Sequence, residues 1–248
     1  MRGEGAARLF LQAALNGART RAEHPRVPLT AAELADAAEE AMEAGADAVH
    51  LHVRSANGAE SLEPDDVAAV LDAVRRRCPR APVGVSTGIW IVPDSHRRID
   101  LVRRWPILPD FASVNFDEPG AVELAQVLLA RGVGIEAGLA GATAARTLRD
   151  SGLLDSILRI LLEPAEKTVA EALRTVAEIE TLLPAPPAAP PRLLHGTGPT
   201  AWPLLAEAAR RQYAARIGLE DTLEVADATP AADNGELVRE ARRVKSEG

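Results

Sequence analysis

The sequence predicts an α/β protein, a single (β/α)8 TIM barrel that spans residues 1–248. Short apolar runs alternate with longer, alanine-rich amphipathic stretches along the chain, and this alternation is typical of a parallel sheet with crossover helices. The length of 248 residues matches barrels of this type, which commonly have about 250. Polar residues also follow the apolar runs, at the strand ends where the chemistry of such barrels lies.

The first strand and helix have clear boundaries. We expect the first strand at Leu9–Leu15, closed by the turn residues Asn16-Gly17. The helix begins at Thr30, whose hydroxyl can cap the first turn while Glu33 reaches back to it, the spacing of a capping box. Gly45 ends the helix, because glycine readily adopts the left-handed conformation found after a helix.

The same unit is expected to repeat seven times. The further strands are Ala46–Arg54, Pro82–Thr87, Phe111–Phe116, Gly132–Gly138, Ile157–Leu162, Arg192–His195 and Ala214–Leu219. The further helices cover about 64–78, 94–104, a segment from Pro119, 141–151, 166–182, a segment after Pro199, and 234–245. The proline-rich segment Pro184–Pro191 reads as a surface connector. An open doubly wound sheet is the alternative, but it normally has a glycine-rich phosphate turn after the first strand, where this chain has Asn16-Gly17-Ala18-Arg19.

Composition argues against a nucleic-acid-binding protein, a disulfide-bonded protein and a membrane protein. The formal net charge of −8 argues against a nucleic-acid partner, although it does not exclude an anionic small substrate. The single cysteine, Cys78, cannot form an internal disulfide and is expected to be an inert thiol at a helix end, which fits a cytoplasmic location. Residues 1–14 show no long apolar run with a cleavage site, so we expect neither a signal peptide nor a membrane span.

Polar and ionisable side chains are expected at the end of every strand. They are Asn16, His50, His52, Ser86, Thr87, Asn115, Glu136, Glu163, His195, Glu220 and Asp221. Because the carboxyl ends of the strands meet at one face of a closed barrel, these side chains should surround a common site.

The motif His50-Leu51-His52 indicates a metal site. Residues two apart on a strand face the same side, with a rise of about 6.6 Å, so two imidazoles can bind one ion while Leu51 packs against the helices. Glu220 ends the last strand, which barrel closure brings near the first two. Two histidines and one carboxylate leave positions open for a substrate, as a catalytic zinc requires. The alternatives are two solvated or hydrogen-bonded histidines, and a helix cap formed by Glu220 and Asp221 with Thr222.

Other strand ends allow two interpretations each. The segment Ser86-Thr87-Gly88 suits a substrate carboxylate or forms an ordinary turn. Glu136 and Glu163 are general bases or partners of arginines. Asn115 binds substrate or caps its loop, and the two spaced glycines of 195–198 are a weak indication of phosphate binding. Arg54 should face the helix layer and have a structural role.

Several segments together resemble the β-keto acid cleavage enzymes, the family that includes 3-keto-5-aminohexanoate cleavage enzyme. They are Ala13–Gly17, Glu43–Ala46, His50–Arg54, Ser86–Gly88, Arg216–Asp221 and Asn234–Val238. They occur in the same order over nearly the whole chain.

The resemblance implies a Zn²⁺-dependent (β/α)8 enzyme that forms a homo-oligomer, a dimer or a tetramer. Such enzymes convert a β-keto acid and acetyl-CoA into acetoacetate and a new CoA thioester. It also implies these roles: metal ligands His50, His52 and Glu220; a catalytic dyad of Arg216 and Asp221; an active-site acid Glu136; and substrate contacts at Ser86 and Asn115. Thr87 adjoins Ser86 and is expected to contact the substrate too.

Arg19 departs from the family member that handles an amino substrate, which has glutamate there. A cation should attract a carboxylate, so we expect a substrate with an anionic or neutral distal end, such as the dicarboxylate 3-oxoadipate; alternatively, Arg19 pairs with Glu23 at the surface. The turns 161–164 and 195–197 also differ from glycine-rich family segments, at the rim where a thioester would bind. The alternative functions are a zinc-dependent aldolase or hydrolase that does not use CoA, and a metal-binding barrel that has lost catalysis.

Overall fold

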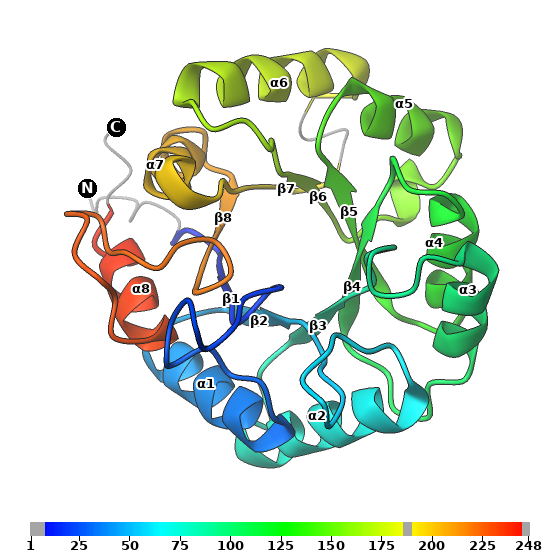
Figure 1. Cartoon of the computed structure of the whole chain (residues 1–248). Helices are drawn as coiled ribbons and strands as arrows, with labels where there is room; N and C mark the ends of the chain where they lie inside the picture. Colours follow the sequence, from blue (N-terminus) through cyan, green and yellow to red (C-terminus); the bar gives the residue numbers. More distant parts are fainter. Residues whose placement is uncertain (1–7, 186–189, 245–248) are drawn as a thin grey trace, which may run out of the picture.

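Eight parallel strands close into a barrel in the order β1 to β8, and a helix follows each strand (Figure 1). The computed structural model describes residues 8–185 and 190–244. The strands are β1 Leu11–Ala14, β2 Ala48–Leu51, β3 Val83–Ser86, β4 Phe111–Asn115, β5 Gly134–Leu139, β6 Arg159–Leu162, β7 Arg192–Leu194 and β8 Ala214–Ile217. The helices are α1 Ala31–Glu43, α2 Pro64–Arg77, α3 Ser95–Arg103, α4 Ala121–Ala130, α5 Ala142–Asp150, α6 Val169–Leu182, α7 Ala201–Arg210 and α8 Asn234–Ala241. The predicted (β/α)8 barrel is confirmed.

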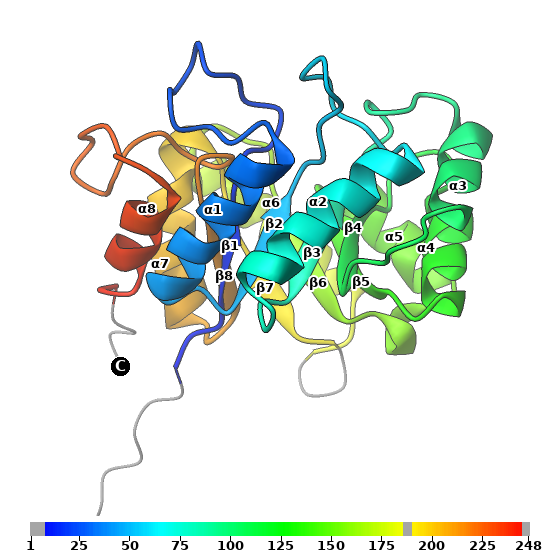
Figure 2. The ribbon, with the colours of Figure 1, turned by 90° about the horizontal axis from the view of Figure 1, so that it is seen from below.

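The helices form the outer ring of the barrel, and apolar side chains fill the layer between them and the strands (Figure 1). Val49 and Leu51 of β2 belong to this layer, whereas His50 between them faces the barrel interior because strand side chains alternate. The loops after β1 and β2 project from the same end of the barrel, the carboxyl end of the strands (Figure 2). The alternation in β2 therefore assigns its apolar groups to the helices and His50 to the interior.

The opposite, amino-terminal end of the barrel is filled by side chains. Arg159, the first residue of β6, lies over the ring of Phe10 at 4.2 Å and over that of Phe111 at 5.5 Å from the ring centres. Its guanidinium also pairs with Glu136 at 3.2 Å, and Glu136 accepts a hydrogen bond of 2.7 Å from Gln12. This end is packed, so access to the interior is from the carboxyl end.

The helix boundaries follow the capping signals of the sequence. Thr30 and Glu33 form the expected capping box at the start of α1, and Gly45 after the helix has φ +109°. Cys78 is the C-cap residue of α2. Burial raises the pKa of its thiol, and a raised pKa fits the expected inert role. The last helix ends at Ala241 rather than at 245, and part of the expected connector 184–191 lies outside the described residues.

Strand β2 is shorter than expected, because it ends at Leu51 instead of Arg54. His52 follows directly, and the side chain of Asn16 takes the place of a neighbouring strand. Its amide oxygen accepts from the His52 backbone N–H at 2.9 Å, and its amide nitrogen donates to the His52 carbonyl at 2.9 Å. Asn16 therefore holds His52 in an extended conformation beyond the last strand residue.

None of the helices within residues 8–185 and 190–244 combines the length and the apolar character that a membrane crossing requires.

The closure between β8 and β1 depends on a glycine. A Cβ atom on Gly218, directly after β8, would lie 1.9 Å from the carbonyl oxygen of Ala14 in β1. We expect Gly218→Ala to lower the free energy of unfolding by about 2–3 kcal/mol, since the backbone has to move apart to fit the methyl group. Urea denaturation measures this loss.

Gly141→Ala is the matched control, because a Cβ on Gly141 meets no described atom within 4 Å and its φ of −179° suits any residue. A Gly218→Ala protein as stable as the control would contradict the close packing of β8 against β1.

Candidate active site

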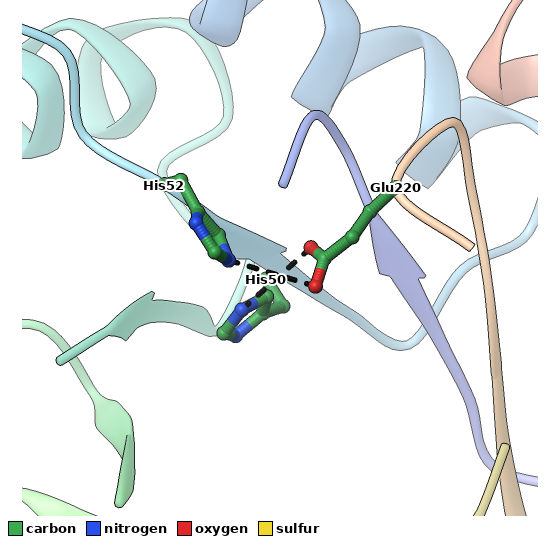
Figure 3. A group of neighbouring side chains, drawn as sticks. All are labelled: His50, His52 and Glu220. Carbon is green, nitrogen blue, oxygen red and sulfur yellow. Dashed lines mark ion pairs between the residues drawn. The ribbon is translucent and has the colours of Figure 1, made fainter. Parts of the chain in front are cut away.

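His50, His52 and Glu220 converge at the carboxyl end of the barrel (Figure 3). One ligand atom of each lies within 4.8 Å of those of the other two. The Nε2 atom of His50 is 3.8 Å from Oε2 of Glu220, and that of His52 is 3.5 Å from Oε1. The expected convergence of the second and the eighth strand is thus present.

The geometry of these three side chains fits a metal ion. Ligand atoms at about 2.1 Å from a tetrahedral ion are about 3.4 Å from one another, close to the distances in this group. Oε2 of Glu220 is buried without a hydrogen-bond partner among the described residues. A buried polar atom without a partner is costly, and a cation bound between the three side chains would supply that partner.

His52 is oriented by a residue that the sequence analysis missed. The Nδ1 atom of His52 hydrogen-bonds to the carboxylate of Glu60, which also accepts from the indole N–H of Trp90 at 3.1 Å. The two rings of His52 and Trp90 stack at 6.2 Å. A carboxylate on the second nitrogen of a histidine is the common partner of a metal-binding imidazole, because it fixes the ring and the tautomer.

The charge states of His50 and Glu220 favour metal binding. Burial lowers the pKa of His50 to about 3, so this imidazole is neutral at pH 7. Burial alone would raise the pKa of Glu220, but Arg216, His52 and His50 hold it well below its usual value, so its carboxylate is ionised. Burial would also lower the pKa of His52, yet Glu220 and Glu60 raise it to about 9. A metal ion would displace the proton of His52.

Glu220 is positioned by the turn after β8. Its side chain lies against Gly17, where a Cβ atom would come within 2.4 Å of the Glu220 Cγ, and Gly17 has φ +53°. Arg216 donates to Glu220 at 2.8 Å. The alternative helix cap with Thr222 is wrong, because the next helix, α8, starts only at Asn234.

Arg216 and Asp221 form a buried pair beside the trio. The guanidinium donates from Nη2 to Oδ1 at 2.6 Å and from Nε to Oδ2 at 3.2 Å. Asp221 is fully buried and Arg216 is 5% exposed. The Asp221 carboxylate raises the pKa of Arg216 against the opposing effect of burial, so this cation is permanent.

Glu136 is deeper in the barrel than expected. The sequence predicts Glu136 at the end of its strand, but Glu136 is the third residue of β5, and this strand continues to Leu139. It is fully buried between Gln12 and Arg159 on the floor of the interior. Burial raises the pKa of Glu136 despite Arg159, and one carboxylate oxygen has no hydrogen-bond partner among the described residues.

The residues expected to contact substrate differ in their orientation. Ser86 ends β3 on the same face as Gly84, which pairs in register with His50. Thr87 points elsewhere, since its hydroxyl donates to the Ser113 carbonyl at 2.6 Å, so this expected contact is not supported. Asn115 caps its loop by donating to Glu118 at 2.8 Å.

The other amide atom of Asn115, its Oδ1, faces Gly138 of the next strand. A Cβ atom on Gly138 would meet Oδ1 of Asn115 at 2.6 Å and Oε1 of Glu163 at 2.2 Å. Asn115 and Glu163 therefore lie side by side above Gly138, on the opposite side of the barrel from the metal ligands in β2.

Two further arginines lie at the loop after β1: Arg19 belongs to this loop, and Arg54 reaches it from the segment after β2. Arg19 pairs with Glu23 at 2.9 Å, the alternative considered for this residue. Arg54 is structural, as expected, but it contacts a loop rather than the helices: its guanidinium donates to the carbonyls of Gly17 and Arg19. Arg54 thereby fixes the segment that packs against Glu220.

The segment 195–198 does not form a phosphate-binding loop. The Gly198 N–H donates to the Asp221 carbonyl at 2.7 Å, and the N–H groups of Thr197 and Thr200 are bonded within the segment. His195 itself faces the interior between Asp221 and Glu163.

The Glu60 contact leads to a prediction for metal affinity. Glu60→Gln removes the charge that polarises His52, so we expect the affinity for a divalent ion to fall about 10- to 100-fold. Competition with a chromogenic chelator measures this affinity. Glu63→Gln is the control, because Glu63 follows in the same loop and pairs with Arg97 at the surface; equal affinities in the two variants would contradict the role of Glu60.

Comparison with known proteins places the chain in a family. The model of the family "beta-keto acid cleavage enzyme" matches residues 8–247. A 3-keto-5-aminohexanoate cleavage enzyme of Acetoanaerobium sticklandii is 25% identical over 261 residues, which cover 97% of this chain and 92% of that protein. A 3-oxoadipate:acetyl-CoA acetyltransferase of Cupriavidus necator is 44% identical over 66 residues, which cover 27% of this chain and 23% of that protein.

Solved structures agree on the fold. The apo structure of ObcA superposes with a TM-score of 0.67 at 18% identity, over 87% of this chain and 61% of that one. A ternary complex of ObcA with a C4-CoA adduct and oxalate gives a TM-score of 0.66. The chain thus spans about 61% of the length of ObcA. Because the family model covers nearly all of the sequence, this protein belongs to the β-keto acid cleavage enzyme family.

Proposed function

We propose that this protein is a zinc-dependent acyltransferase that converts a 3-oxo acid and acetyl-CoA into acetoacetate and a new acyl-CoA. One observation carries the proposal: in a member of this family, three side chains able to bind a metal, His50, His52 and Glu220, converge beside a buried Arg216–Asp221 pair at the open end of the barrel. The similarity to a 3-oxoadipate:acetyl-CoA acetyltransferase supports acetyl-CoA as the second substrate.

His50, His52 and Glu220 are the residues that would hold zinc. Zinc bound there supplies a Lewis acid that stabilises the negative charge on an enolate oxygen. The two neutral imidazoles and one carboxylate are a common catalytic ligand set, which leaves room for substrate oxygens.

The neighbouring residues perform the proton chemistry. The carboxylate of Asp221 removes a proton from C2 of the 3-oxo acid, and Arg216 keeps this carboxylate oriented through two hydrogen bonds. Ser86, at the carboxyl end of β3, binds the substrate carboxylate through its hydroxyl, and Asn115, at the carboxyl end of β4, hydrogen-bonds to the substrate. Glu136, on the floor, contributes an acid group below the site.

The substrate is expected to have an anionic or neutral distal end. Arg19 stands on the loop that packs against Glu220, where it pairs with the half-exposed Glu23. A cation at this place favours a distal carboxylate over an ammonium group. The 3-oxo dicarboxylates, 3-oxoadipate first, are therefore the preferred class of substrate.

We also expect the protein to form a homo-oligomer, a dimer or a tetramer. Analytical ultracentrifugation distinguishes these states.

The function is tested by elemental analysis of the purified protein and by a screen of 3-oxo acids with and without acetyl-CoA. We expect about one zinc per chain and turnover only with acetyl-CoA. Asp221→Asn should keep the zinc and lower kcat at least about 100-fold, because the amide cannot accept a proton. Asp227→Asn, a change at an exposed turn of the same loop, should leave kcat unchanged.

Other outcomes would favour other functions. Cleavage of a 3-oxo acid without acetyl-CoA would indicate an aldolase or hydrolase on the same barrel. Bound metal without any turnover would indicate a barrel that has lost catalysis. Near-normal turnover by Asp221→Asn with intact zinc would exclude Asp221 as the base.

The role of Arg19 gives a separate prediction. We expect Arg19→Ala to raise KM for 3-oxoadipate about tenfold, the loss of one charge pair of roughly 1.4 kcal/mol, while KM for an uncharged 3-oxo acid of equal length stays the same. Arg21→Ala is the control, since Arg21 is in the same loop and pairs with Glu33. If 3-oxo acids with a distal amine are the best substrates of the wild-type protein, the assignment of Arg19 is wrong.

A further inference from the structure

His195 is a buried ionisable group between two carboxylates, and the proposed proton chemistry does not yet use it. It follows β7 directly and is 3% exposed. Its Nδ1 atom is 3.5 Å from Oδ1 of Asp221, and its Nε2 atom is 3.5 Å from Oε2 of Glu163. Neither ring nitrogen has a hydrogen-bond partner of ordinary geometry among the described residues. A histidine that only filled space here would leave two polar atoms unsatisfied at a cost.

The charges around His195 come from four side chains on three strands or directly after them. Asp221 follows β8 and Glu163 follows β6, and both carboxylates attract a protonated ring. Arg216 of β8 repels it, and Glu136 of β5 is the remaining acid nearby. Burial and Arg216 by themselves would lower the pKa of His195, but the contacts with Asp221 and Glu163 raise it above its usual value. The surroundings thus stabilise an imidazolium ion.

The proposed reaction requires a temporary place for one proton. Asp221 removes a proton from C2 of the 3-oxo acid, and the resulting enolate attacks the carbonyl carbon of acetyl-CoA, from which the CoA thiolate leaves. The thiolate then adds to C3 of the first substrate, the C2–C3 bond breaks, and the enolate of acetoacetate takes the proton back. No proton is gained or lost overall, so the enzyme has to hold this proton throughout the acyl exchange.

Asp221 alone is poorly suited to hold it. Both of its oxygens accept hydrogen bonds from Arg216, so a proton stored on this carboxylate would have to disrupt one of these bonds. Nδ1 of His195 is an acceptor 3.5 Å from Oδ1 of Asp221. Once protonated, the ring lies between the negative charges of Asp221 and Glu163, an arrangement related to the aspartate–histidine pairs of hydrolases.

We propose that His195 is a relay residue that stores the substrate proton: it receives the proton from Asp221 at Nδ1, hydrogen-bonds to Glu163 through Nε2, and returns the proton to Asp221 when acetoacetate forms. This role rests on the proposed acyl transfer and extends it by a residue on β7. His195 acts through Asp221 and needs no contact with the substrate itself.

Two amide variants separate proton storage from a merely structural hydrogen bond. His195→Asn places an amide near the position of Nδ1, and His195→Gln places one near Nε2, but neither amide takes up a proton. Storage predicts that both variants lower kcat at least about 100-fold, with KM, zinc content and thermal midpoint nearly unchanged. His96→Asn is the matched control, because His96 is an exposed histidine on α3.

Normal kcat in either amide variant would overturn the proposal, since a hydrogen-bonding role alone survives such a change. If neither variant folds, Glu163→Gln serves instead, because Glu163 is partly exposed and its charge stabilises the imidazolium; we expect kcat to fall about tenfold, and an unchanged kcat would overturn the proposal.

A second assay keeps this test independent of the proposed function. Exchange of the C2 hydrogens of a 3-oxo acid in D₂O, without acetyl-CoA, reports proton removal and its passage out of the site. Storage predicts enzyme-catalysed exchange in the wild type and a loss of at least about tenfold in both amide variants. Exchange at the wild-type rate in these variants refutes the role of His195, whereas wild-type exchange without any acyl transfer refutes the proposed function alone.

Discussion

The contact between the end of β8 and β1 is the constraint on which the whole site depends. Gly218 allows the backbone to approach Ala14 closely, and the Glu220 N–H then donates to the Ala14 carbonyl at 3.2 Å. This places the Glu220 side chain opposite two histidines that arrive from β2, on the other side of β1. A larger residue at 218 would move the carboxylate away from the imidazoles. The metal-binding geometry is therefore a consequence of how the barrel closes.

The interior of the barrel contains several buried polar and charged side chains. Gln12, Glu136, His195, Arg216 and Asp221 are all at most 5% exposed. Burial of charged groups is costly unless each has a partner of opposite charge. In this barrel arginines are the partners: Arg159 pairs with Glu136, and Arg216 pairs with Asp221 and Glu220. The polar atoms that remain without partners are concentrated at the site, as is expected where substrate or metal completes the set.

Much of this architecture could be predicted from the sequence, because alternation of strands and helices and the facing of residues i and i+2 are local properties. His50, His52 and Glu220 were found in this way. The depth of a side chain within the barrel could not be predicted, as Glu136 shows. Alternation gives the face on which a strand residue lies, but its position along the barrel axis depends on the stagger between neighbouring strands. The orientation of Thr87 was missed for a related reason, since it continues the outward face of β3.

Residues that act from loops were the hardest to predict. Glu60 orients His52 from eight positions further along the chain, and no periodicity links the two. Asn16 was recognised as a strand-end residue, yet its side chain extends the pairing of β2, which only the position of the neighbouring strand reveals. Only a chemical argument could have predicted the role of Glu60. An acidic residue in the loop directly after a pair of metal-binding histidines is a candidate hydrogen-bond partner for one of the two imidazoles.

The central claim is that His50, His52 and Glu220 share one metal ion. X-ray absorption spectroscopy at the zinc edge of the purified, active protein tests it most directly. The structure predicts a first shell of nitrogen and oxygen atoms at about 2.0–2.2 Å, with the outer-shell scattering of two imidazoles and no sulfur. A spectrum with one imidazole or none, or a sulfur shell from Cys78, would contradict the site.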